Sequence, residues 1–148
     1  MSLEERRGAY IDELAVGQTA SFSKTVTEAD IVLFAGISGD TNPVHLDEQY
    51  AGQTVFRGRI AHGLLSASLL SAVLGTKLPG PGCIYLNQTL AFKAPVRIGD
   101  TVTARVTVRE ILADKNRVVL ETVCHVGNKL VLEGEATVMV PARAEAAD

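Results

Sequence analysis

The pattern of apolar and polar positions divides the chain into a mixed first part and a second part that is rich in strand. In the first part, residues 19–26 alternate loosely and predict a short strand at the edge of a sheet. Thr27 to Asp30 has the form of a helix capping box, and apolar residues at helical spacing follow it to about Ile37. A further helical turn is predicted at residues 47–51.

Residues 62–78 have a different pattern from the segments before them. They combine helix-forming residues with apolar side chains on nearly every face, which is typical of a helix surrounded by protein. A membrane-spanning helix is the alternative, but the run is short, contains three serines and ends near Lys77. We therefore predict a buried central helix and no contact with a membrane.

Strands are predicted for almost all of the chain beyond the proline- and glycine-rich break at residues 79–82. The segments are rich in Val, Ile, Thr and Leu, and turn sequences at 113–116 and 127–129 separate them. We predict an antiparallel meander whose strands cover residues 83–92, 100–112, 117–126 and 130–140.

A helix that is apolar all round needs a wall of sheet on several sides. The predicted fold class is therefore α+β, an antiparallel sheet wrapped around a central buried helix, which is the layout of a hot dog fold. Such a sheet leaves an edge strand and part of the helix uncovered, and a second copy would bury both, so we expect a homodimer. We treat residues 1–148 as one domain, with residues 1–10 and 142–148 loosely ordered.

Composition narrows the classes of function. The chain has 148 residues, of which 47% are hydrophobic, enough for a substantial core. Its formal charge of -3, with Lys and Arg scattered, provides no basic stripe for nucleic acid or an anionic membrane, so we expect a small-molecule partner. Cys83 and Cys124 lie alone in apolar sequence, which predicts two reduced thiols, no metal site and a cytoplasmic protein. No apolar stretch typical of a secretory signal opens the sequence.

The candidate chemistry lies in residues 34–45, where the first helix is expected to end. Pro43 disfavours helical dihedral angles at Asn42, so Asp40 and His45 are expected on a stiffened loop that Asn42 and Pro43 support. A carboxylate and an imidazole within reach of one water can act as general base and general acid, which suits the addition or removal of water. An Asp-x-Asn-Pro segment alone is usually a turn, and it is His45 that favours a catalytic pair.

The start of the central helix adds a second requirement of that chemistry. Free backbone N–H groups and the positive end of the helix dipole lie there, and Gly63 has no side chain, so a thioester oxygen could rest against its amide. Such an oxyanion hole would stabilise the charge that forms when water adds to a double bond conjugated to a thioester. His62 is a candidate substrate contact, or else a histidine bonded to backbone, whereas His125 is expected to be structural.

Residues 34–45, with Ala51 six residues on, resemble the signature of the R-specific enoyl-CoA hydratases of the MaoC-like hydratase/dehydratase family. The likeness continues in residues 60–64 at the helix start and in residues 92–100 of the sheet. The first motif, Asp-x-Asn-Pro-x-His in this setting, is specific. The Phe-x-x-Pro-Val-x-x-Gly-Asp motif of residues 92–100 is shared more widely by hot dog proteins and indicates the fold only.

The resemblance implies syn addition of water to a trans-2-enoyl-CoA, giving an R-3-hydroxyacyl-CoA, in fatty acid or polyhydroxyalkanoate metabolism. It implies that Asp40 and His45 form the catalytic dyad at a dimer interface. The substrate would be an acyl-CoA thioester, and no cofactor would be needed because CoA is part of that substrate.

Three alternatives to this function stay open. A 3-hydroxyacyl-[acyl carrier protein] dehydratase could have the same loop, because the dyad acts at the double bond and not at the carrier. Hot dog thioesterases typically place an acidic residue on the central helix, and residues 63–78 contain no Asp or Glu. A noncatalytic acyl-CoA binding module would keep Gly63 but would have no need of both Asp40 and His45.

Overall fold

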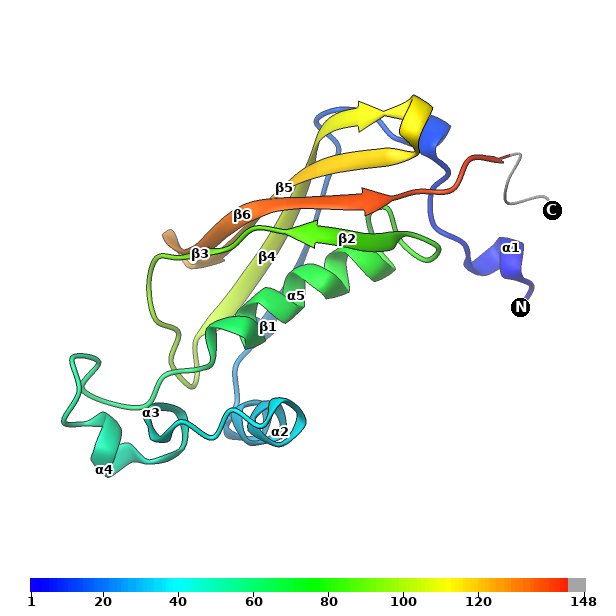
Figure 1. Ribbon diagram of the computed structural model, residues 1–148. Helices are drawn as coiled ribbons and strands as arrows, with labels where there is room; N and C mark the ends of the chain where they lie inside the picture. The colour runs from blue at the N-terminus through cyan, green and yellow to red at the C-terminus, as the bar shows by residue number, and fades with distance from the viewer. Residues whose placement is uncertain (144–148) are drawn as a thin grey trace.

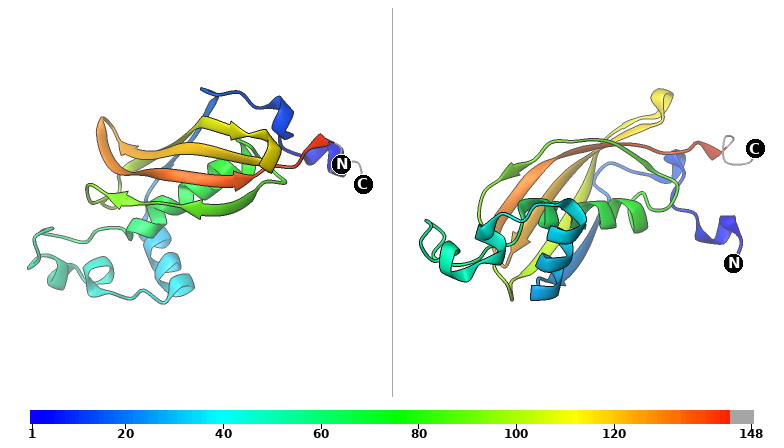
Figure 2. Two further views of the ribbon diagram at one scale, coloured as in Figure 1. Left: turned by 45° about the horizontal axis from the view of Figure 1, so that its top comes forward. Right: turned by 60° about the horizontal axis from the view of Figure 1, so that its bottom comes forward.

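The computed structural model describes residues 1–143 and shows a curved antiparallel sheet lying over one long helix (Figures 1 and 2). That helix, α5, and the strands form what we call the body, and residues 27–61, with three short helices, form an arm beyond the N-terminal end of α5 (Figure 1). The elements in chain order are α1 (Leu3–Arg6), η1 (Ile11–Glu13), β1 (Thr19–Thr25), α2 (Glu28–Ser38), α3 (Pro43–Leu46), α4 (Glu48–Ala51), α5 (Gly63–Thr76), β2 (Ile84–Gln88), β3 (Ala91–Phe92), β4 (Thr101–Leu112), η2 (Ala113–Lys115), β5 (Arg117–Val126) and β6 (Lys129–Met139).

The strand order in the sheet is β1-β4-β5-β6-β2, with β3 also paired to β6, and every pairing is antiparallel. The predicted edge position of β1 is confirmed. The predicted meander is correct for β4, β5 and β6 but wrong for residues 83–92, which form two short strands on the far side of β6. The chain passes from β2 to β3 at Thr89, close to Gly134 of β6. A Cβ added at Gly134 would lie 1.8 Å from the Thr89 backbone oxygen. The pattern indicated strand but contained no information on this close crossing.

The core lies between α5 and the concave face of the sheet. Leu70 and Val73 of α5 are fully buried against strand residues such as Val106 and Leu120, because alternate side chains of each strand point toward the helix. The predicted fold class, an antiparallel sheet around a central helix, is confirmed. The sheet covers only one side of α5 within a single chain, since Leu64 is 58% exposed. None of the helices of residues 1–143 is long and apolar enough to cross a membrane.

Residues 8–10 pack against the segment at 79–81, so the expectation that residues 1–10 are loosely ordered does not hold for these three, whereas residues 1–6 are exposed. The Gly8 and Ala9 amides donate hydrogen bonds to the Pro81 and Pro79 carbonyls, at 2.7 and 2.8 Å. Tyr10 is buried, and the Arg7 guanidinium lies over its ring. Local composition did not reveal the two hydrogen bonds because their partners are at least seventy residues away. Of residues 142–148, which we also expected to be loose, 144–148 lie outside the described part of the chain.

Candidate active site

The turn that carries Asp40 follows directly from the end of α2. Gly39, with φ of 80°, takes the left-handed conformation that ends the helix, and glycine adopts it without steric cost. The Asn42 N–H then donates to Asp40 Oδ1 at 3.2 Å, and Asn42 Oδ1 accepts a hydrogen bond from the Val44 N–H at 3.1 Å. The carboxylate is therefore held by a turn of the main chain.

His45 lies on a short helix, not on the loop that we predicted. Asn42 caps α3 through its side chain, and Pro43 occupies the first helical position, where its fixed φ suits the helix and its missing N–H costs nothing. The Asn-Pro pair by itself indicates a loop, because a proline disfavours helix in the residue before it. Here that residue is the cap, so the same two residues begin a helix.

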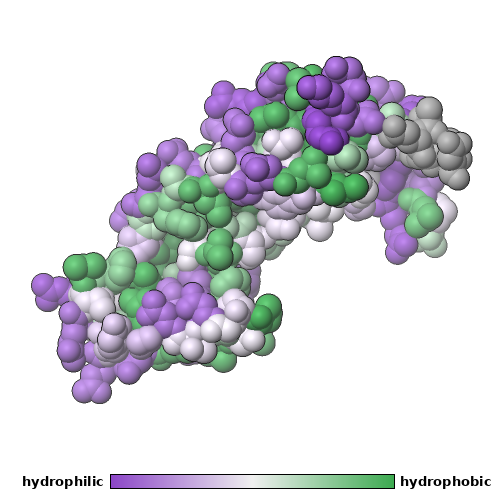
Figure 3. All heavy atoms as spheres, in the orientation of Figure 1, coloured by the Kyte–Doolittle hydropathy of each residue, from purple (hydrophilic) through white to green (hydrophobic). Residues whose placement is uncertain are grey.

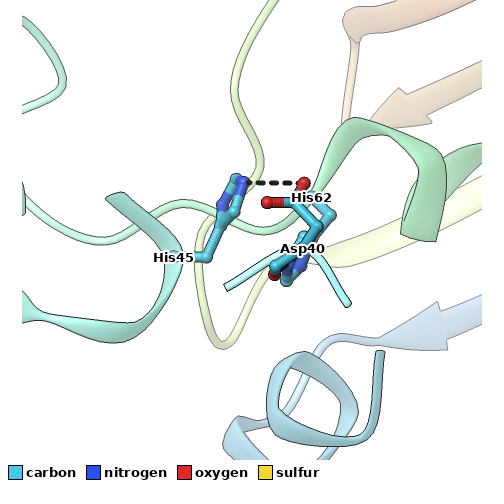
Figure 4. Close-up of side chains that lie close together, drawn as sticks. All are labelled: Asp40, His45 and His62. Carbon is cyan, nitrogen blue, oxygen red and sulfur yellow. Dashed lines mark hydrogen bonds and ion pairs between the residues drawn. The ribbon is translucent and has the colours of Figure 1, made fainter. Parts of the chain in front are cut away.

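The imidazole of His45 has one defined tautomer. His45 is 7% exposed, and its Nδ1 lies 2.8 Å from the Ile60 carbonyl oxygen. A carbonyl can only accept, so Nδ1 carries the hydrogen and the Nε2 of neutral His45 has a free lone pair. Nε2 lies 3.9 Å from Asp40 Oδ2 (Figure 4). That separation is too long for a direct hydrogen bond, but one water could donate to both atoms.

The environment keeps His45 neutral at physiological pH. Burial lowers its pKa from the usual 6.5 because the charged ring loses hydration. The hydrogen bond to the Ile60 carbonyl raises the pKa in part. Proximity to His62 lowers the pKa further, and the charge of the Asp40 carboxylate raises it. The net direction is downward, so Nε2 is available as a base at neutral pH.

His62 lies directly beside this pair, at the start of α5. Its ring stacks on that of His45 with centroids 3.8 Å apart, and its Nε2 lies 2.9 Å from the Asp40 backbone oxygen (Figure 4). The sequence left open a substrate contact or a bond to backbone, and the structure shows the bond to backbone. Nδ1 of His62 is buried and has no hydrogen-bond partner within residues 1–143.

Gly63 is the first residue of α5, so its N–H has no acceptor within the helix. The sequence suggested that the missing side chain admits a ligand, but the space is filled by the Phe92 ring, whose Cε1 would lie 2.6 Å from a Cβ at Gly63. The glycine therefore lets β3 pack against the helix start. In the sequence Phe92 belongs only to a fold motif, and no local signal places it here.

These groups share one cavity of about 440 Å³ at the junction of arm and body. It is largely apolar, with the polar atoms of the candidate pair at one side, as in ligand pockets generally. Its lining comprises Asp40, His45, Phe56, Ile60, Ala61, His62, Gly63, Leu64, Ser66, Phe92, Lys93, Ala94, Pro95, Val96, Val131 and Leu132. The four predicted chemical positions, 40, 45, 62 and 63, thus meet in one place. Ser66 was missed, although it lies four residues after His62 on the same helix face.

A metal ion is the other chemistry that this cluster suggests. Asp40, His45 and His62 can each offer one ligand atom, and these atoms lie within 4.8 Å of one another. The two rings are stacked with an interplanar angle of 29°, however, and imidazole lone pairs lie in the ring plane. Nearly parallel planes do not direct both lone pairs to one ion, so the arrangement fits acid–base chemistry better than metal binding.

Comparison with known proteins identifies the family of the chain. The model of the MaoC-like domain family matches residues 13–132, which include the whole cavity lining. The chain belongs to the MaoC-like domain family. It is 60% identical to the (R)-specific enoyl-CoA hydratase of Rhodospirillum rubrum, over 97% of this chain and 99% of that protein.

Two further relatives of this MaoC-like protein extend the comparison. The 3-hydroxybutyryl-CoA dehydratase of Methylorubrum extorquens is 51% identical over 97% of this chain and 92% of its own length. The structure of R-hydratase PhaJ1 from Pseudomonas aeruginosa superposes with a TM-score of 0.86 at 48% identity, covering 92% of this chain and 88% of that one. Hydratases and dehydratases catalyse one reversible reaction in opposite directions.

Proposed function

We propose that this protein is an R-specific enoyl-CoA hydratase, which adds water reversibly and syn to a trans-2-enoyl-CoA to give an R-3-hydroxyacyl-CoA. One observation carries the proposal. The free Nε2 of neutral His45 and the Asp40 carboxylate lie 3.9 Å apart at an apolar cavity, which is also lined by Gly63, whose N–H has no acceptor within α5. Fatty acid or polyhydroxyalkanoate metabolism is the setting that we infer.

Both members of the pair accept hydrogen bonds in the resting site, which defines the proton's route. A water held between them forms a bond from its oxygen to the β-carbon while one of its protons passes to the pair. The electron pair of the double bond moves toward the thioester carbonyl, and the Gly63 N–H stabilises the charge on that oxygen. The same proton then passes from the pair to the α-carbon as the electrons return. Oxygen and proton arrive from one side, so addition is syn.

This sequence of steps uses only water, two side chains and one backbone N–H of the protein, and we infer that no cofactor takes part. Asn42 and Pro43 would act on geometry alone, by capping α3 so that His45 faces Asp40. His62, a candidate substrate contact in the sequence, has its Nε2 bonded to the Asp40 main chain.

The carrier of the acyl group separates this proposal from its nearest alternative. The names of the Rhodospirillum and Methylorubrum relatives both specify CoA, which favours CoA over acyl carrier protein here. A thioesterase is disfavoured because α5, Gly63–Thr76, has no acidic residue to act as base or nucleophile. A binding module would not require a tautomer that frees Nε2 of His45 beside a carboxylate.

We also infer a homodimer and a cytoplasmic location. The edge strand β2 exposes Ile84 and Leu86, and apolar residues (green) are visible on the face where β2 and α5 lie (Figure 3). Pairing of β2 with its copy would extend the sheet and cover the exposed side of α5. Light scattering should then give about twice the mass of one chain. Cys83 and Cys124 are both unpaired, as expected of thiols in a reducing compartment.

The proposed reaction is tested with crotonyl-CoA, followed by loss of the enoyl-thioester absorbance. We expect Asp40→Asn and His45→Gln each to lower kcat about 10²–10⁴-fold, the usual contribution of a general acid or base, with melting temperatures close to wild type. His125→Gln, outside the cavity, is the matched control and should keep full activity. Retention of turnover by either dyad variant would contradict the assignment.

Two further measurements separate the alternatives. The product is offered to dehydrogenases specific for the R or the S alcohol, and oxidation by the S-specific enzyme would rule out the stated stereochemistry. Crotonyl-CoA and crotonyl-acyl carrier protein are then compared as substrates, and a higher kcat/KM for the carrier protein would favour the alternative dehydratase.

A further inference from the structure

We propose that His62 is a positioning residue that aligns both members of the catalytic pair, by bonding to the main chain of Asp40 and by supporting the ring of His45. The inference rests on the proposed function for its kinetic part only. It replaces the expectation that His62 contacts the substrate.

The contact with Asp40 is the first support for this role. A carbonyl only accepts, so the 2.9 Å contact means that His62 Nε2 carries a hydrogen and donates it to the Asp40 oxygen. The other hydrogen bonds of the turn at residues 39–41 come from residues at most four positions away. Among the described residues, His62 alone ties this turn to the body by a hydrogen bond. The Asp40 side chain is 51% exposed, so side-chain packing does little to fix the carboxylate.

The contact with His45 is the second support. The hydrogen bond from Nδ1 to the Ile60 carbonyl fixes one edge of the His45 ring but leaves rotation about that bond. The His62 ring stacks on the His45 ring, with centroids 3.8 Å apart, and limits that rotation. His62 is held in turn by Phe34, whose ring centroid lies 4.8 Å away, and is only 2% exposed. Nε2 of His45 therefore keeps its direction toward Asp40.

The burial of His62 argues against a role in substrate contact. Its Nε2 is already used by Asp40, and its Nδ1 has almost no accessible surface. A substrate atom would have to displace packed groups to reach either nitrogen. A ring with one donor is what the two supporting contacts require, and the histidine side chain supplies both the ring and the donor.

Single substitutions can separate the two contacts. His62→Phe keeps a ring for stacking and loses the donor, His62→Asn keeps a donor and a good helix cap but loses the ring, and His62→Ala loses both. His125→Gln is the matched control on β5, away from the cavity. For crotonyl-CoA we expect kcat to fall about tenfold in His62→Phe and His62→Asn and about a hundredfold in His62→Ala, because small misplacements of reacting groups are costly. KM should stay within about twofold.

The kinetic outcomes decide between positioning and binding. If His62→Ala keeps kcat within twofold of wild type, or raises KM while kcat is unchanged, the positioning role is wrong. Melting temperatures are measured in parallel, and if His62→Ala does not fold, the Phe and Asn variants decide by the same criteria.

Nuclear magnetic resonance gives a readout that does not depend on the reaction. The chain has three histidines, so the ring C–H signal of His45 can be assigned from its loss in His45→Gln. We expect this signal to move in His62→Asn, where the ring current of the stacked neighbour is lost, and to stay shifted in His62→Phe. An unchanged His45 signal in all variants would overturn the proposal. If wild-type protein does not hydrate crotonyl-CoA, the proposed function fails, and the spectra alone decide the role of His62.

Discussion

The body and the arm keep their side chains in place by different means. In the body, residues such as Leu70, Val106 and Leu120 are fully buried between helix and sheet, so apolar packing fixes them. The arm has short helices and exposes Leu33 and Ile37 of α2, so it has little core of its own. The candidate pair lies in the arm, and individual polar contacts at its junction with the body align it. Stability should therefore reside mainly in the body, and the alignment of the pair mainly in that junction.

The largest expected effect on stability comes from removing packing in the body. Leu70 is fully buried on α5, and Leu70→Ala should lower the free energy of unfolding by about 2–5 kcal/mol, the range for buried leucines. Folded protein at 25 °C should keep its kcat, because Leu70 does not line the cavity. Urea unfolding and crotonyl-CoA turnover measure the two quantities. A large loss of kcat with little change in stability would contradict the division between body and arm.

The opposite result is expected for Arg59, which links His45 to α2 within the arm. Its Nε donates to the His45 carbonyl at 2.7 Å, and its Nη1 pairs with Glu28 of α2 at 2.7 Å. Arg59→Met should lower kcat about tenfold through misalignment of His45, with a loss of stability of about 1 kcal/mol or less.

The matched control for Arg59 is Arg109→Met, which removes an exposed ion pair with Glu121 between strands of the body. Its kcat should equal that of wild type. If the two arginine variants have the same kcat, Arg59 does not align the pair.

The smallest expected effect is on pH dependence. The pKa of His45 is lowered from 6.5, mainly by burial, so the acid limb of kcat/KM should lie below pH 6.5. Above pH 6.5 the ring is mostly neutral in both the folded and the unfolded chain. As pH falls below 6.5, His45 of the unfolded chain binds a proton before His45 of the folded chain does. The stability contributed by neutral His45 is therefore lost progressively until the pH reaches the pKa of the folded state. His125→Gln should leave the limb in place, and a limb at or above pH 6.5 would show that His45 is not desolvated.

Much of the fold follows from local pattern. The capping box from Thr27 to Asp30 is present, with Asp30 N–H donating to Thr27 Oγ1 at 3.2 Å, because its bonds join residues three apart. The helix predicted over residues 62–78 runs from Gly63 to Thr76. The place of residues 83–92 beyond β6 could not be predicted, since strand pairing depends on contacts between segments distant in sequence.

The candidate site divides in the same way. The sequence alone determined that Asp40 and His45 would be near each other, because two residues that are five positions apart and joined by a turn cannot lie far apart. It also placed Gly63 at a helix start. Only the tertiary structure decided that Ile60 fixes the His45 tautomer, that Phe92 fills the space beside Gly63 and that His62 stacks on His45. Those contacts join residues that lie at least 15 positions apart in the sequence, and local propensity contains no information about which surfaces meet.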